Sequence, residues 1–263
     1  MSAREAASDG SGSLAEARLE AQNAMQWLAR LAFSYTAPGG DALLRWDQGR
    51  SVVTTGELAS GVTAELCLPA LRLQFAEQNR PSAHPIDLDG KSSSEVEAWI
   101  LVELLHRGFD RDRFATRLPY QWAHLMAGDE PKYMAETRAP ALTELTTLYN
   151  QAASVILETG QRADHESGST AGESDRNLIC WPDSFDIGIA LPAAPGGPDG
   201  GHIEVRFTTG CETEVQPEYR TRYAGRRAGA PRIARVAPDG LSATEIAARL
   251  ADEITLARRA ALN

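Results

Sequence analysis

The sequence has few cysteines and no long apolar run. Its three cysteines, Cys67, Cys180 and Cys211, lie far apart and form no C-x-x-C pair, which argues against a zinc finger or a disulfide framework. No apolar segment approaches the roughly 18–20 residues of a membrane-spanning helix. The first residues contain no apolar stretch of the kind found in a secretory signal. These absences predict a cytoplasmic protein with no membrane association.

The common catalytic and nucleotide-binding motifs are also missing. The chain contains no Walker A sequence, no H-E-x-x-H, no G-x-S-x-G and no G-x-G-x-x-G after a strand-like segment. No cofactor is therefore indicated. The net charge of −10 opposes binding to nucleic acid and to anionic membrane surfaces.

Hydrophobic periodicity indicates both helices and strands. Helical spacing runs from Leu14 to about Pro38, and a second long helix is predicted over 140–158. Two capping boxes, Ser92-x-x-Glu95 and Ser242-x-x-Glu245, mark two more helix starts. Alternation of apolar and polar residues predicts short strands at 43–47, 51–58, 62–68, 71–75, 178–191, 202–208 and 218–224. This order predicts an α+β fold, with antiparallel β-meanders packed against several amphipathic helices.

Composition predicts how the chain is divided. Residues 1–13 are small and polar and are predicted to be disordered. An α+β N-terminal part follows over 14–159, and the polar, glycine-rich residues 160–176 are predicted to be a linker or loop. Residues 177–263 form a β-hairpin part with a C-terminal helix. The two parts are either separate domains or one continuous domain.

The main candidate site is the polar side of the predicted C-terminal strands. In CWPDSFDIGIALP (180–192), read as a strand, alternation places Phe185, Ile187 and Ile189 on the core side and Asp186 on the other. If the three strands are neighbours, their outward side chains share one surface: Asp186, His202, Glu204, Arg206, Arg220 and Arg222. Such a surface suits acid–base chemistry or an anionic substrate. It also fits an ordinary half-buried sheet in which Glu–Arg pairs only stabilise the fold.

Under the catalytic hypothesis each residue has a role. Asp183 or Asp186 is the acid/base or metal-binding carboxylate, and His202 is the proton carrier. The predicted substrate-binding residues are Trp181, Glu204, Arg206, Arg220 and Arg222. Asp183 has a structural alternative, because an aspartate after Trp-Pro often caps a turn.

An arginine-rich stretch and one cysteine leave two further alternatives open. Residues 217–236 contain six arginines and one glutamate, which either bind an anionic ligand or pair with the acidic remainder of the chain. Cys211 lies at a predicted hairpin turn, as an exposed nucleophile or a bystander.

The segment Trp181-Pro182-Asp183-Ser184-Phe185-Asp186 resembles the Trp-Pro-His-His-Phe-Asp motif of a family of uncharacterised bacterial proteins. In that family a β-hairpin follows the motif, and its turn corresponds to residues 210–212. Segments 25–32, 88–90 and 117–122 are similar as well. The resemblance implies a fold and no particular activity. Asp183 and Ser184 replace the two histidines, and serine is a poor metal ligand.

These observations lead to three functional hypotheses. The first is a cytoplasmic protein that binds or turns over a small anionic molecule on the polar face of the C-terminal sheet. The second is a non-catalytic protein-interaction module. The third is a metal-dependent hydrolase, which requires Asp183, Asp186 and His202 to converge. The sequence does not indicate an oligomeric state.

Overall fold

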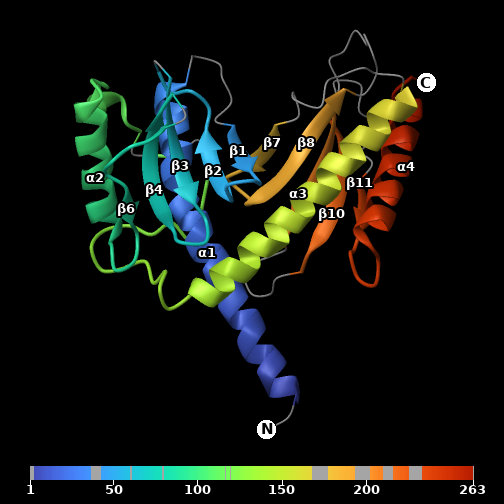
Figure 1. The fold of residues 1–263 in the computed structure, drawn as a ribbon, viewed down its shortest axis with the longest axis horizontal. Helices are drawn as coiled ribbons and strands as arrows, with labels where there is room; N and C mark the ends of the chain where they lie inside the picture. The colour runs from blue at the N-terminus through green and yellow to red at the C-terminus, as the bar shows by residue number, and fades with distance from the viewer. Residues whose placement is uncertain are drawn as a thin grey trace. The chain divides into compact units, whose positions relative to one another are not determined.

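The computed structural model confirms the α+β fold. It describes residues 3–36, 43–59, 61–78, 80–115, 117–118, 120–167, 177–192, 202–209, 216–224 and 233–262. In these ranges the chain forms four α-helices, one 3-10 helix and eleven strands, and the paired strands are antiparallel (Figure 1).

The chain divides into two compact units. The first comprises Met1–Leu148 and Cys180–Phe185 with Glu212–Glu214, and the second comprises Tyr149–Ile179, Asp186–Cys211 and Val215–Asn263. The division falls inside helix α3 (Ala139–Ser167) and strand β7 (Leu178–Trp181).

The strands of the first unit form the predicted meander. The four consecutive neighbours are β1 (Leu44–Asp47), β2 (Val52–Thr55), β3 (Val62–Cys67) and β4 (Arg72–Glu77). Two short strands that the sequence did not indicate, β5 (Arg80–Pro81) and β6 (Ile86–Asp87), both pair with β4. The apolar side chains of alternating positions, such as Leu66, Leu73 and Phe75, are buried.

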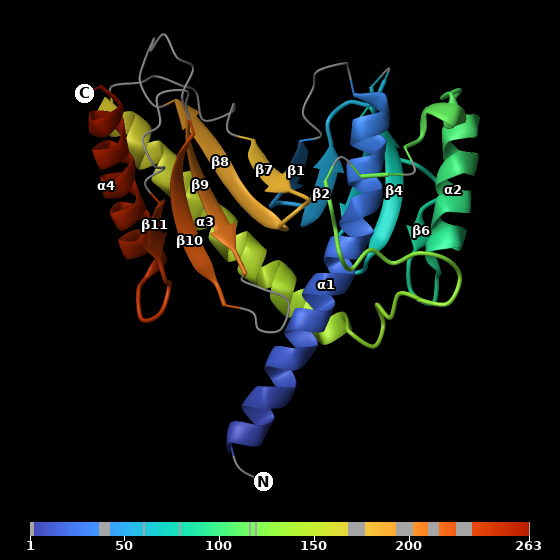
Figure 2. The ribbon, with the colours of Figure 1, turned by 180° about the vertical axis from the view of Figure 1, so that it is seen from behind.

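Helix α1 (Ala3–Tyr35) packs against β1, β2 and β3 of this meander (Figure 2). From Leu14 to Tyr35 it is buried on nearly every side. A helix in such a position is normally apolar all round, yet α1 buries seven charged or polar side chains: Arg18, Glu20, Gln22, Asn23, Gln26, Arg30 and Ser34. Three of these side chains donate hydrogen bonds to the turn at 182–185.

Helix α2 (Ser93–His106) begins at the predicted capping box. The Ser92 hydroxyl accepts a hydrogen bond from Glu95 N, and the Glu95 carboxylate accepts one from Ser92 N. Trp99 packs on Phe75 of β4, with ring centroids 5.7 Å apart. After α2 the chain makes one 3-10 turn, η1 (Arg111–Arg113), and the described residues between η1 and α3 form no further helix or strand.

The second unit is built around four antiparallel strands. Their order is β8 (Asp186–Pro192), β9 (His202–Thr208), β10 (Glu218–Ala224) and β11 (Ile233–Val236). Helix α3 covers one face, where Tyr149 meets Phe207 edge to face. Helix α4 (Ala243–Leu262) starts after the second capping box and lies along β9, β10 and β11.

Three local predictions need correction. Helix α1 starts at Ala3, so residues 3–13 are helical where disorder was predicted. Helix α3 extends to Ser167 and not to about Glu158, so residues 160–167 of the predicted linker are also helical; 168–176 lie outside the described residues. The stretch 178–191 is not one strand, because a turn over 182–185 separates β7 from β8.

No helix within the described residues combines the length and the hydropathy that crossing a bilayer requires.

Candidate functional site

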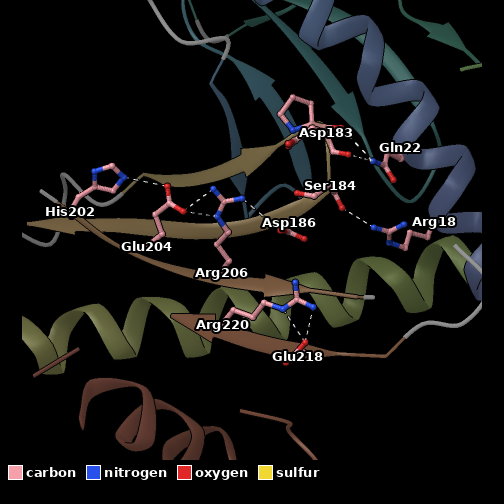
Figure 3. A network of polar contacts seen from close by, with 11 residues as sticks. Arg18, Gln22, Asp183, Ser184, Asp186, His202, Glu204, Arg206, Glu218 and Arg220 are labelled. Atoms are coloured by element: carbon pink, nitrogen blue, oxygen red, sulfur yellow. Dashed lines mark hydrogen bonds and ion pairs between the residues drawn. The ribbon is translucent and has the colours of Figure 1, made fainter. Parts of the chain in front are cut away.

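The turn at 182–185 is fixed by helix α1 within the first unit. Gln26 Nε2 donates to the Pro182 carbonyl at 3.0 Å, and Gln22 Nε2 donates to the Asp183 carbonyl at 3.0 Å. Arg18 Nη2 donates to the Ser184 carbonyl at 2.7 Å (Figure 3). A buried carbonyl without a partner costs free energy, so these side chains stabilise the unusual backbone of the turn.

Phe185 closes the turn in a strained conformation. Its φ is +56°, in the left-handed region that bulky residues rarely adopt. Its amide donates to the Trp181 carbonyl at 2.8 Å, and its ring is fully buried. Burial of the ring and the bonds from α1 hold this conformation. The sequence correctly predicts Phe185 as a core residue but places it in a strand.

Trp181 and Asp183 belong to the first unit, whereas the other predicted site residues belong to the second. Trp181 is half-buried, and the Asp183 side chain is exposed. Burial raises the pKa of Tyr120, and the nearby Asp183 carboxylate raises it further. Tyr120 OH in turn donates to Gln26 Oε1. The contacts of the motif are thus largely those of a structural turn.

The register of the second unit confirms that the three predicted strands are neighbours. Arg206 lies directly across from Gly188 on β8 and from Arg220 on β10. Glu204 lies across from Ala190 and Arg222. Because side chains alternate between faces, the register assigns one face to all six predicted residues: Asp186, His202, Glu204, Arg206, Arg220 and Arg222.

A hydrogen bond and two ion pairs of Arg206 connect these residues. His202 Nε2 lies 3.2 Å from Glu204 Oε1, and Arg206 Nη2 lies 2.8 Å from Glu204 Oε2. Arg206 Nη1 also lies 3.8 Å from Asp186 Oδ2. Figure 3 shows these four side chains in a row from His202 to Asp186. Glu204 and Asp186 therefore serve mainly as ion-pair partners of Arg206.

A second feature of this face is a lateral row of arginines. Arg206, Arg220 and Arg235 are directly opposite one another on β9, β10 and β11, about 5 Å from strand to strand. Like charges in such positions repel. Glu218 offsets part of this repulsion, at 2.8 Å from Arg220 and 3.5 Å from Arg235.

Two of the predicted catalytic residues, Asp186 and His202, do not come together. His202 is opposite Pro192, and Asp186 precedes Pro192 by six residues on the same strand. At about 3.3 Å per residue, Asp186 and His202 are roughly 20 Å apart, too far for one small ligand. The convergence required for the metal-dependent hydrolase is therefore absent. The described residues contain no group of three or more His, Cys, Asp or Glu side chains that could hold a metal ion.

Two sequence hypotheses fall partly outside the described residues. Cys211 and the turn 210–212 lie outside them, as do residues 225–232 of the arginine-rich stretch. The described arginines of that stretch, Arg220, Arg222 and Arg235, all belong to the polar sheet face.

The sequence hypotheses missed the polar residues of α1. Arg18, Gln22, Gln26 and Arg30 recur every fourth residue, so they lie on one face of the helix. They are all buried. The signal was available in the sequence as polar residues at helical spacing within an apolar helix. Their partners come from distant segments and could not be read from that spacing.

Comparisons with known protein families, with curated proteins and with solved structures give no match. The resemblance to the Trp-Pro-His-His-Phe-Asp family therefore stays a prediction.

Proposed function

We propose that the second unit binds a small anionic molecule through the arginines of its polar sheet face. The observation that carries this proposal is the charge of that face. It holds four arginines, namely Arg206, Arg220, Arg222 and Arg235, and three carboxylates, namely Asp186, Glu204 and Glu218. A locally cationic surface on a chain of net charge −10 attracts anions that the rest of the chain repels.

Arg222 is the most available of the four cations. Its side chain is exposed, and within the described residues it forms no ion pair. Arg220 is bound to Glu218, yet its side chain is 40% exposed and its guanidinium retains further donors. On the neighbouring strand β9, Glu204 is directly opposite Arg222 and Arg206 is directly opposite Arg220. An anion with two charged groups would contact both exposed arginines.

The second unit would bind this molecule, and the predicted catalytic residues would not convert it. Asp186 and His202 are too far apart to act on one small ligand, and Glu204 and Asp186 are engaged with Arg206. Asp183, the alternative carboxylate, belongs to the first unit. We assign this binding protein to the cytoplasm on the sequence grounds given above.

Titration calorimetry on the full chain tests the proposal, with pyrophosphate and citrate as the probes. We expect saturable binding that Arg222→Ala weakens about tenfold, because a charge-assisted hydrogen bond contributes roughly 1.5–3 kcal/mol. The matched control is Arg249→Ala, which removes an exposed arginine from α4 of the same unit.

Equal weakening by Arg222→Ala and Arg249→Ala would show that only net charge matters and would refute the site. Absence of binding to both probes at a matched chloride concentration would refute the proposal. Binding of an acidic polypeptide alone would favour the protein-interaction module.

A further inference from the structure

One arginine of α1 differs from the other polar residues of its face. Arg18, Gln22 and Gln26 each donate to a backbone carbonyl of the 182–185 turn. Arg30 continues the same row one turn later and is only 7% exposed. Its guanidinium has neither a hydrogen bond nor an ion pair with any residue that the structure describes, and its Nε atom is fully buried.

The surroundings of Arg30 are mostly aromatic. The guanidinium carbon lies 4.7 Å from the centroid of the Trp27 ring. Trp27 Nε1 donates to Tyr133 OH at 3.1 Å, which leaves the hydroxyl hydrogen of Tyr133 free to donate. Burial lowers the pKa of Arg30, and Glu97, Tyr133 and Tyr120 oppose that effect through their charges. Glu97 is near enough to act on Arg30 but forms no ion pair with it.

A charge in this position is costly. Removing an unpaired ion from water costs several kcal/mol, and a guanidinium does not escape that cost by losing its proton. A stacked aromatic ring returns roughly 1–2 kcal/mol. A bound anion would supply the missing partner.

We propose that Arg30 anchors a buried binding site for a small monocarboxylate in the first unit. The planar guanidinium matches a carboxylate with two parallel hydrogen bonds. A single buried cation is balanced by a single negative charge, whereas a phosphate dianion would leave an excess beside Glu97. This site is independent of the arginines on the sheet of the second unit.

Residues 120–126, all of which the structure describes, provide the entrance. Tyr120 lies near Arg30 and is tied to α1 through Gln26, and Met126 N donates to Asn23 Oδ1 at 2.9 Å. Between them, Trp122 Nε1 is buried and has no hydrogen-bond partner among the described residues. These residues have no regular secondary structure, so the segment can shift without breaking a helix or a strand. Opening it admits the ligand.

Unfolding of the full chain tests the site through tryptophan fluorescence. All five tryptophans belong to the first unit, so this signal reports on that unit. Sodium acetate is the probe, sodium chloride controls for ionic strength, and acetamide is the neutral molecule of the same shape. We expect a saturable rise in Tm with acetate alone.

Two variants locate the effect. Arg30→Met keeps the volume and removes the charge, so it should fold, unfold at the same or a higher temperature in chloride, and lose the acetate response. Arg30→Lys keeps the charge but not the paired donors, so acetate should bind about tenfold more weakly. Arg222→Ala should leave the acetate response unchanged, which separates this site from the one proposed above.

The acetate titration of the wild-type protein tests the carboxylate site even if a variant fails to fold. If acetate stabilises the protein no more than chloride and acetamide do, there is no carboxylate site. A rise in Tm with phosphate but not with acetate would overturn the assignment of ligand class. An equal acetate response in the wild type and Arg30→Met would show that Arg30 is not the anchor.

Discussion

Helix α1 and the polar face of β8–β10 both carry rows of charged and amide side chains, but they use them differently. On α1 these side chains are buried, and most bind the backbone of distant segments. On the sheet they bind one another and, apart from the buried Asp186, remain partly exposed. Buried polar groups have no water to replace a lost partner, so we expect the α1 contacts to be individually strong and the sheet contacts weak.

The largest effect should come from the Glu20–Arg138 pair of the first unit. Glu20 is 3% exposed, accepts a hydrogen bond from Met134 N and forms an ion pair with Arg138. Glu20→Ala leaves Arg138 and a backbone amide without their partner, so the free energy of unfolding should fall by about 3 kcal/mol. Urea unfolding monitored by tryptophan fluorescence measures it.

The control for Glu20→Ala is Glu16→Gln. Glu16 lies one turn earlier and contacts the same Arg138 at 3.6 Å, but its side chain is 64% exposed. Its replacement should cost less than about 1 kcal/mol. Similar losses for the two variants would show that burial does not decide the strength of these pairs.

An intermediate effect is expected at Gln26. Gln26→Leu keeps the volume but removes the donor to the Pro182 carbonyl and the acceptor of Tyr120 OH. Unfolding free energy should fall by about 1–3 kcal/mol, because the partly buried Tyr120 hydroxyl loses its acceptor and the Pro182 carbonyl keeps only the 3.5 Å contact from Gln22 Nε2. Tyr120→Phe removes only the second contact. If the two substitutions act through that contact, their effects measured together will be non-additive; additivity within about 0.5 kcal/mol would contradict the shared hydrogen bond.

The smallest effect is expected on the sheet. Glu218→Gln weakens the ion pairs with Arg220 and Arg235, whose side chains are 40% and 65% exposed. We expect a loss below about 1 kcal/mol that disappears in 1 M salt, where charges are screened beyond about 3 Å. Far-UV circular dichroism is the measurement, since the second unit contains no tryptophan. A larger loss that persists in salt would show that the ion pairs of this face are as strong as the buried contacts of α1.

The elements were largely predictable because their signals are local. Alternation located β3, β4, β9 and β10 closely, and the capping boxes located the starts of α2 and α4. Strands β5 and β6 were missed because they have only two residues each. Strand β11 was missed because its sequence, Ile-Ala-Arg-Val, does not alternate between apolar and polar residues. The break between β7 and β8 was missed because Phe185 adopts a left-handed conformation that its residue type disfavours.

The candidate site was predictable only in part. The shared face of Asp186, Arg206 and Arg220 follows from alternation once the strands are adjacent. The distance between Asp186 and His202 depends on register, which pairing between separate strands determines. The sequence did not indicate a site at Arg30, because a lone arginine in a helix is normally exposed and solvated.

The sequence by itself determined the α+β class, the periodicity of the main elements and which side chains share a strand face. Each of these follows from backbone geometry over a few residues. Only the tertiary structure decided which polar groups have partners. It placed the sheet arginines beside carboxylates and directed the α1 amides to the carbonyls of the 182–185 turn. It left Arg30 buried with no hydrogen bond or ion pair from its guanidinium to any described residue. Burial and pairing depend on segments far apart in the chain, and short-range periodicity carries no information about their contacts.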